Sequence, residues 1–301
     1  MNRTAICGIA RFVCLGEAVP STIYRERMPA PWAACAVSGV WVQHVLAPGS
    51  TYQHRTVPSG CIELACVPGG DSITVVGPRQ GPLVQYLEPG VRVVGVRLRA
   101  AAASAVLAAP ASELLDLRIG LEDLWGRSAR VLAEQIAVAT SPDVAASLIE
   151  RAVATRLAAV GEPDRIISEA VRHLQLAHTV RLSDLTTELS ISARQLRRRF
   201  HNSLGYGPTT LRRILRFQGF LALSAAAVDH TSLARVSFSA GYADQAHPDQ
   251  RMRSPERPYA TGAPRRNEAK LRRQPRSRRL ACGLPAPEPY APICRVRPQI
   301  R

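Results

Sequence analysis

The chain has 301 residues, enough for two domains with hydrophobic cores of their own. A hydrophobic fraction of 46% excludes wholesale disorder, and no apolar run approaches the roughly 18 residues that a membrane span needs. The net charge of +16 is uneven: residues 1–180 carry 16 Lys/Arg against 15 Asp/Glu, residues 181–245 carry 9 against 4, and residues 246–301 carry 14 against 4. This asymmetry predicts a polyanionic partner for the carboxy-terminal half.

The first part of the chain is predicted to be β-rich, because short apolar or alternating runs are separated by turns with proline and glycine. These runs are Val37–Leu46, Cys61–Val67, Ser72–Gly77 and Val91–Arg99. We expect a sandwich-like or barrel-like arrangement, preceded by an amino-terminal extension over residues 1–23. Residues 100–160 are rich in Ala and Leu at helical spacing, and Ser141 before Pro142 is typical of a helix start. The predicted fold class is α+β, with residues 24–160 forming a sensor or dimerisation domain.

The chain after a linker at Gly161–Pro163 is predicted to be all-helical, and residues 182–204 carry its most informative pattern. A short helix and a tight turn precede a helix in which Leu196, Phe200 and Leu204 recur every four residues, which gives an apolar stripe. The opposite side carries Arg194, Arg197, Arg198 and His201. A helix that is anchored on one face and cationic on the other suits a DNA major groove.

A second unit of the same kind is predicted further along the chain. Gly205–Pro208 ends the arginine-rich helix, and a long helix is expected over residues 209–226. Its apolar face is predicted to contain Leu211, Ile214, Leu215, Gln218, Leu221 and Ala222. Another short helix, a turn at Gly241 and the start of a further helix are expected within Ser232–His247. Two helix-turn-helix units joined by a long helix form a distinctive arrangement.

This arrangement resembles the DNA-binding domain of AraC/XylS-type transcriptional regulators. The resemblance covers residues 164–247 and is carried by Leu185, Glu188, Leu189, Arg194–Phe200, Gly205, Pro208, Leu215–Gln218 and Gly241–His247. Upstream, the segments Trp41-Val-Gln, Gly60-Cys-Ile-Glu-Leu, Gly77-Pro-Arg and Gly95-Val-Arg-Leu-Arg are similar to the β-rich amino-terminal domain of one branch of these regulators. The glycine that is usual in the first turn is Ser190 here, and Thr186 and Thr187 replace common alanines.

The resemblance implies a sequence-specific regulator that binds double-stranded DNA. It places Arg194, Arg197 and Arg198 at bases, His201, Asn202 and Arg212 near phosphates, and Gln245 in the second reading helix. Arginine suits base reading because its forked guanidinium can pair with guanine O6 and N7. A small-molecule effector and a homodimer are the further partners considered for the amino-terminal domain. Trp32, Trp41, Tyr52 and Tyr86 are pocket candidates there, although aromatic residues in a small β domain more often form core.

The resemblance ends at Pro248, where the second reading helix would have to continue. Three prolines within residues 248–258 exclude a regular helix, and residues 248–301 are expected to form a disordered Arg/Pro-rich tail. A one-base shift of the reading frame from codon 248 permits an amphipathic helix followed by a Gly-x-Thr-Pro turn. We therefore interpret the tail as the product of a frameshift, which weakens the second half of a bipartite DNA site. A basic tail that adds nonspecific phosphate affinity is the alternative.

The remaining interpretations concern enzymes and location. A metal-dependent cupin-like enzyme is the main alternative function, because His44, His54 and Glu63 lie in the β-rich part, and a non-functional frameshifted regulator is the other. The histidines are ten residues apart, so we expect no enzyme, catalytic residue, metal or cofactor. The seven cysteines show no Cys-x-x-Cys spacing, and we expect reduced thiols in a cytoplasmic protein without membrane partners.

Overall fold

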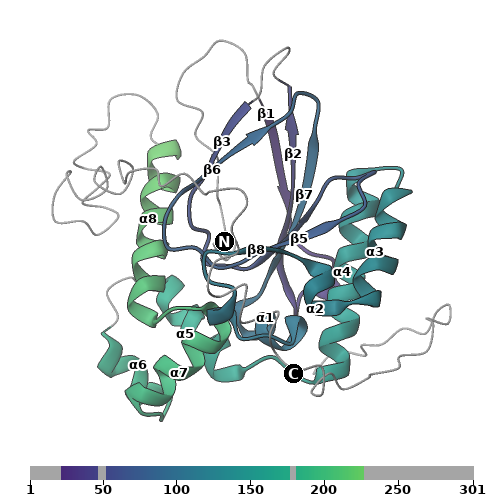
Figure 1. Ribbon diagram of the computed structural model, residues 1–301. Coiled ribbons are helices and arrows are strands. Elements are labelled where there is room, and N and C mark those ends of the chain that lie inside the picture. The colour runs from purple at the N-terminus through teal and green to yellow at the C-terminus, as the bar shows by residue number, and fades with distance from the viewer. Residues whose placement is uncertain (1–21, 47–51, 177–180, 227–301) are drawn as a thin grey trace, which may run out of the picture. The chain divides into compact units, whose positions relative to one another are not determined.

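The computed structural model describes residues 22–46, 52–176 and 181–226, and these residues belong to one compact unit. A β-rich region is followed by helices, so the predicted α+β class is confirmed (Figure 1). The extension over residues 1–23 lies outside the described residues except for the start of the first strand, and the second helix-turn-helix unit and the tail lie wholly outside them.

The strands form two antiparallel sheets. Six strands pair in the order β1-β2-β7-β4-β5-β8, and β3 pairs with β6 in a separate two-stranded sheet. Their bounds are β1 Thr22–Arg27, β2 Val37–Val45, β3 Tyr52–Thr56, β4 Glu63–Cys66, β5 Ile73–Val76, β6 Leu83–Leu87, β7 Arg92–Leu98 and β8 Arg118–Gly120. The four predicted runs correspond to β2, β4, β5 and β7, and the other four strands were not predicted.

A glycine fixes the position of the largest side chain on the six-stranded sheet. Trp41 of β2 is paired with Gly95 of β7, and a Cβ atom added to Gly95 would lie 2.1 Å from Cε2 of Trp41. The indole therefore lies directly over the Gly95 backbone, which no other residue would permit without displacing the ring.

The helices that follow the sheet cover it and close the core. They are α1 Ala100–Leu107, α2 Leu121–Trp125, α3 Arg127–Ala137 and α4 Pro142–Val160. The predicted start of α4 is confirmed, because the Ser141 hydroxyl accepts a hydrogen bond from the Val144 backbone N–H and Pro142 occupies the first turn. On the buried face of α4, the Glu150 carboxylate binds Arg27 at 2.8 Å and accepts the Ala30 backbone N–H at 2.8 Å. This bond anchors α4 to the segment after β1.

The carboxy-terminal helices form a second hydrophobic cluster. They are α5 Arg165–Leu176, α6 Leu182–Glu188, α7 Ala193–Leu204 and α8 Pro208–Ala226. The cluster unites residues of all four with Ala101 of α1, and it includes Ile167, Leu174, Leu185, Leu196, Phe200 and Ile214. The buried face of α8 differs in part from the prediction: Leu211 and Ile214 are buried as expected, but Phe217 and Phe220 are buried whereas Leu221 and Ala222 are only half-buried.

The predicted linker is short and tied at its end. Gly161 ends α4, and the carboxylate of Asp164 accepts the backbone N–H groups of Ile166 and Ile167 at the start of α5. The Asp164 backbone N–H donates to the Ala101 carbonyl at 3.1 Å, and Arg199 of α7 binds the same carboxylate. Asp164 therefore joins α1, α5 and α7 at one point.

Candidate nucleic-acid interface and pocket

The turn between α6 and α7 has a strained residue on one side and a complete cap on the other. Ser190 has a φ of +52°, in the left-handed region that favours glycine. The Ser192 hydroxyl accepts the Gln195 backbone N–H at 3.2 Å, and Gln195 Oε1 accepts the Ser192 backbone N–H at 3.0 Å. This reciprocal capping box fixes where α7 begins and the direction in which it leaves the turn.

One face of α7 is anchored in the protein as the spacing predicted. Leu196 and Phe200 are fully buried and Leu204 is nearly so, all within the cluster that α5, α6 and α8 share. Burial of such side chains contributes about 1.5–3 kcal/mol each. The orientation of the helix is therefore set by its apolar stripe.

The opposite face of α7 is exposed and cationic. Arg194, Arg197, Arg198, His201 and Asn202 are all exposed. Asn202 also donates to the Ser104 hydroxyl of α1 at 3.3 Å, so its amide is directed toward the protein in this structure.

The other predicted DNA-contact residues divide into two groups. Arg212 is half-buried on α8, so it is less accessible than the α7 arginines. Gln245 lies outside the described residues.

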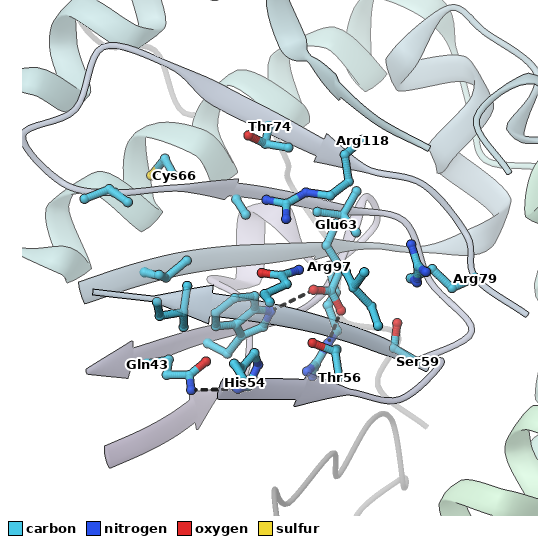
Figure 2. Close-up of a pocket in the computed structure, with 18 of the residues that line it drawn as sticks. Gln43, His54, Thr56, Ser59, Glu63, Cys66, Thr74, Arg79, Arg97 and Arg118 are labelled. Carbon is cyan, nitrogen blue, oxygen red and sulfur yellow. Dashed lines mark hydrogen bonds and ion pairs between the residues drawn. The ribbon is translucent and has the colours of Figure 1, made fainter. Parts of the chain in front are cut away.

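A pocket of about 220 Å³ lies between the two sheets of the β-rich region (Figure 2). Residues from β2 to β8 line it, and its walls combine apolar side chains with Gln43, His54, Glu63, Arg79, Arg97 and Arg118. Of the four aromatic pocket candidates, Trp41 lines this cavity, while Trp32 and Tyr86 are exposed.

A buried ion-pair network occupies one wall of the pocket. The Arg97 guanidinium donates from Nε to Glu63 at 2.9 Å and from Nη2 to the Tyr24 hydroxyl at 2.9 Å, and it also binds Glu26. The Trp41 indole N–H donates to the second Glu63 oxygen at 3.2 Å. Burial opposes the charge of Arg97, but the neighbouring Glu63, Tyr24 and Glu26 raise its pKa above the usual value. Arg97 is therefore a charged but compensated group.

Two further lining groups are neutral because they are buried. Burial lowers the pKa of His54 to about 4, against an opposing effect of Glu63, and its Nδ1 lies 3.1 Å from the Gln43 amide nitrogen. Burial raises the pKa of the Cys66 thiol to about 12. Neither group contributes charge to the pocket near neutral pH.

Arg79 and Arg118 add positive charge to the same cavity. Arg79 is 9% exposed, and Arg118 projects from β8, the last strand of the six-stranded sheet. Partial burial lowers the pKa of Arg118, and the positive charge of Arg79 lowers it further. The two guanidinium groups therefore lie close enough to repel each other.

Two segments next to the pocket contact the carboxy-terminal helices. The Gln218 amide of α8 donates to the Pro58 carbonyl at 2.5 Å. A Cβ atom added to Gly205, at the end of α7, would lie 2.9 Å from Cγ of Pro78. The neighbouring Ser59 and Arg79 line the pocket, so this rim connects the cavity to α7 and α8.

The metal-enzyme alternative lacks a ligand set in the described part of the chain. Within those residues, no group of three or more His, Cys, Asp or Glu side chains is placed to hold a metal ion, and His44, His54 and Glu63 do not form one. Cys35, Cys61 and Cys66 are free thiols.

Comparison with known proteins identifies one domain. Residues 25–120 match a domain of unknown function, DUF6597. No curated protein and no solved structure matches the chain. Within residues 22–46, 52–176 and 181–226, none of the helices is both long and apolar enough to cross a bilayer.

Proposed function

We propose that the chain is a sequence-specific DNA-binding transcriptional regulator of the AraC type, in which α7 reads bases in the major groove of double-stranded DNA. The observation that carries the proposal is the pairing of a buried apolar stripe with an exposed face of arginines on one capped helix. A helix held in this way can offer its cationic face to DNA without losing its packing.

The exposed arginines supply two kinds of contact. Arg194, Arg197 and Arg198 can each donate two parallel hydrogen bonds to a guanine, worth roughly 1–3 kcal/mol of discrimination per base pair. His201 and Arg212 are proposed to contact phosphates, which adds affinity without sequence preference. Asn202 would have to leave Ser104 in order to do the same.

The rest of the chain supports this assignment. Domains of the family matched at residues 25–120 are often found at the amino terminus of AraC-type regulators. Residues 1–180 are nearly neutral, whereas residues 181–245 carry an excess of five positive charges (9 against 4). We assign effector sensing or dimerisation to the amino-terminal domain and DNA binding to the helices after it.

The altered chain after His247 leads us to expect uneven reading of a bipartite site. The half-site read by α7 is expected to carry the specificity, and the basic tail is expected to add salt-sensitive affinity for any duplex.

Titration of the full chain with duplexes from upstream of its own gene and with scrambled duplexes, at several salt concentrations, tests the proposal. We expect a preference for the upstream duplex that persists as salt weakens both complexes. Equal affinity for both duplexes at every salt concentration would contradict specific regulation and favour the non-functional alternative.

A further inference from the structure

The register of the six-stranded sheet gives the pocket a charged end and an apolar end. Arg97 of β7 pairs with Glu63 of β4, Glu63 pairs with Val76 of β5, and Val76 pairs with Arg118 of β8. Directly paired residues of antiparallel strands point to the same face. These four side chains therefore form one row across the face that lines the pocket (Figure 2).

The next row on the same face is uncharged. Trp41 pairs with Gly95, Gly95 with Ala65, and Ala65 with Thr74. Val93 of β7 and Val67, beyond the end of β4, also line the cavity. A ligand that extends away from the charged row would therefore meet the indole of Trp41 and small apolar side chains.

The charges at the polar end do not balance. Glu63 is the carboxylate among the lining residues, and together with Glu26 it binds Arg97. His54 is neutral, so Arg79 and Arg118 leave the lining with an excess of two positive charges. An anion between them would relieve their mutual repulsion and gain charge-assisted hydrogen bonds.

We infer that this pocket is a binding site for a small organic carboxylate, whose anionic group lies between Arg79 and Arg118 and whose apolar body lies against Trp41 and Ala65. The volume of about 220 Å³ is below the 300–1,000 Å³ typical of pockets for drug-sized ligands, so the site suits a small metabolite. The assignment of such a carboxylate as the effector rests on the proposed function, but its binding does not.

The inference is tested on the full chain without DNA, by thermal unfolding with acetate, hexanoate and phenylacetate and with the corresponding uncharged amides. We expect hexanoate or phenylacetate to raise Tm by at least about 3 °C at saturation, and the amides to have no effect. Failure of all three carboxylates to raise Tm more than their amides would overturn the inference.

Variants separate a ligand site from a structural role. Arg118→Gln should abolish the carboxylate-dependent rise and should raise Tm without ligand, because it removes one of two repelling charges. Arg92→Gln makes the same charge change at an exposed position of β7 outside the pocket lining, and should keep the carboxylate response. An unchanged response in Arg118→Gln, or its equal loss in both variants, would contradict the assignment.

Since these measurements contain no DNA, failure of carboxylate binding and failure of DNA binding are distinguishable. A protein that binds the carboxylate but shows no preference among duplexes would retain the pocket assignment and lose the regulator assignment. The reverse result would leave the regulator without this ligand class.

Discussion

Acidification is expected to destabilise the amino-terminal domain through His54. Its imidazole is 5% exposed, and burial lowers its pKa from 6.5 to about 4. Between these two values the unfolded chain binds a proton that the folded chain excludes, so stability falls as pH falls from 6.5 toward 4 and levels off below. Above pH 6.5 both states are neutral at this residue, and its contribution is fully present.

The size of the effect follows from the two pKa values. A displacement of about 2.5 units corresponds to roughly 3 kcal/mol over the whole range, of which about 2 kcal/mol is lost between pH 7 and pH 5. Other carboxyl groups also titrate at low pH, so the informative quantity is the difference between two proteins.

His54→Gln removes the titrating imidazole and retains a polar group opposite Gln43. We expect wild type to lose about 2 kcal/mol more than His54→Gln in the free energy of unfolding between pH 7 and pH 5, measured by urea denaturation. His44→Gln, at a half-buried position of β2, is the matched control and should follow the wild-type profile. Parallel pH profiles for wild type and His54→Gln would refute the reasoning that burial keeps this histidine neutral.

Three substitutions test the packing around the two candidate sites. Ser190→Gly should raise the free energy of unfolding by about 0.5–1 kcal/mol, because glycine adopts a positive φ without strain, and a lower Tm would contradict the turn geometry. Phe200→Ala should cost about 3–5 kcal/mol in chemical denaturation, whereas Arg198→Ala on the exposed face should change stability by less than about 0.5 kcal/mol. Gly95→Ala should cost about 1–3 kcal/mol and abolish the carboxylate-dependent rise in Tm by displacing Trp41, and a retained rise would argue against the ligand position.

The helices were predictable because their signals are local. The cap of α4 is encoded by adjacent residues, Ser141 and Pro142, and the buried stripe of α7 by a four-residue spacing. The predicted α7 interface likewise needed little more than one helix period, which is why its exposed and buried faces agree with the sequence.

The missed strands lack such signals. β1 and β3 contain several charged or polar residues in five or six positions, and β8 has three residues. They lie at sheet edges or in the two-stranded sheet, where one side is left unpaired and polar side chains are tolerated. Composition therefore does not distinguish them from loops.

The pocket was not predictable from single residues, because it depends on register. Glu63, Arg97 and Arg118 are far apart in the sequence and become neighbours only when β4, β5, β7 and β8 pair. Arg79 and Arg97 do lie in the segments Gly77-Pro-Arg and Gly95-Val-Arg, which the resemblance to the amino-terminal domain had already marked. Their shared cavity is the part that only the folded chain supplies.

The central claim is that the exposed face of α7 reads DNA, and an equilibrium binding measurement tests it most directly. Wild type and the double variant Arg194→Ala/Arg198→Ala are compared as full chains by fluorescence anisotropy on the duplex upstream of the gene and on its scrambled counterpart. We predict that wild type prefers the upstream duplex and that the double variant loses this preference while retaining salt-sensitive binding through the basic tail. An equal preference for the upstream duplex in both proteins would contradict the account.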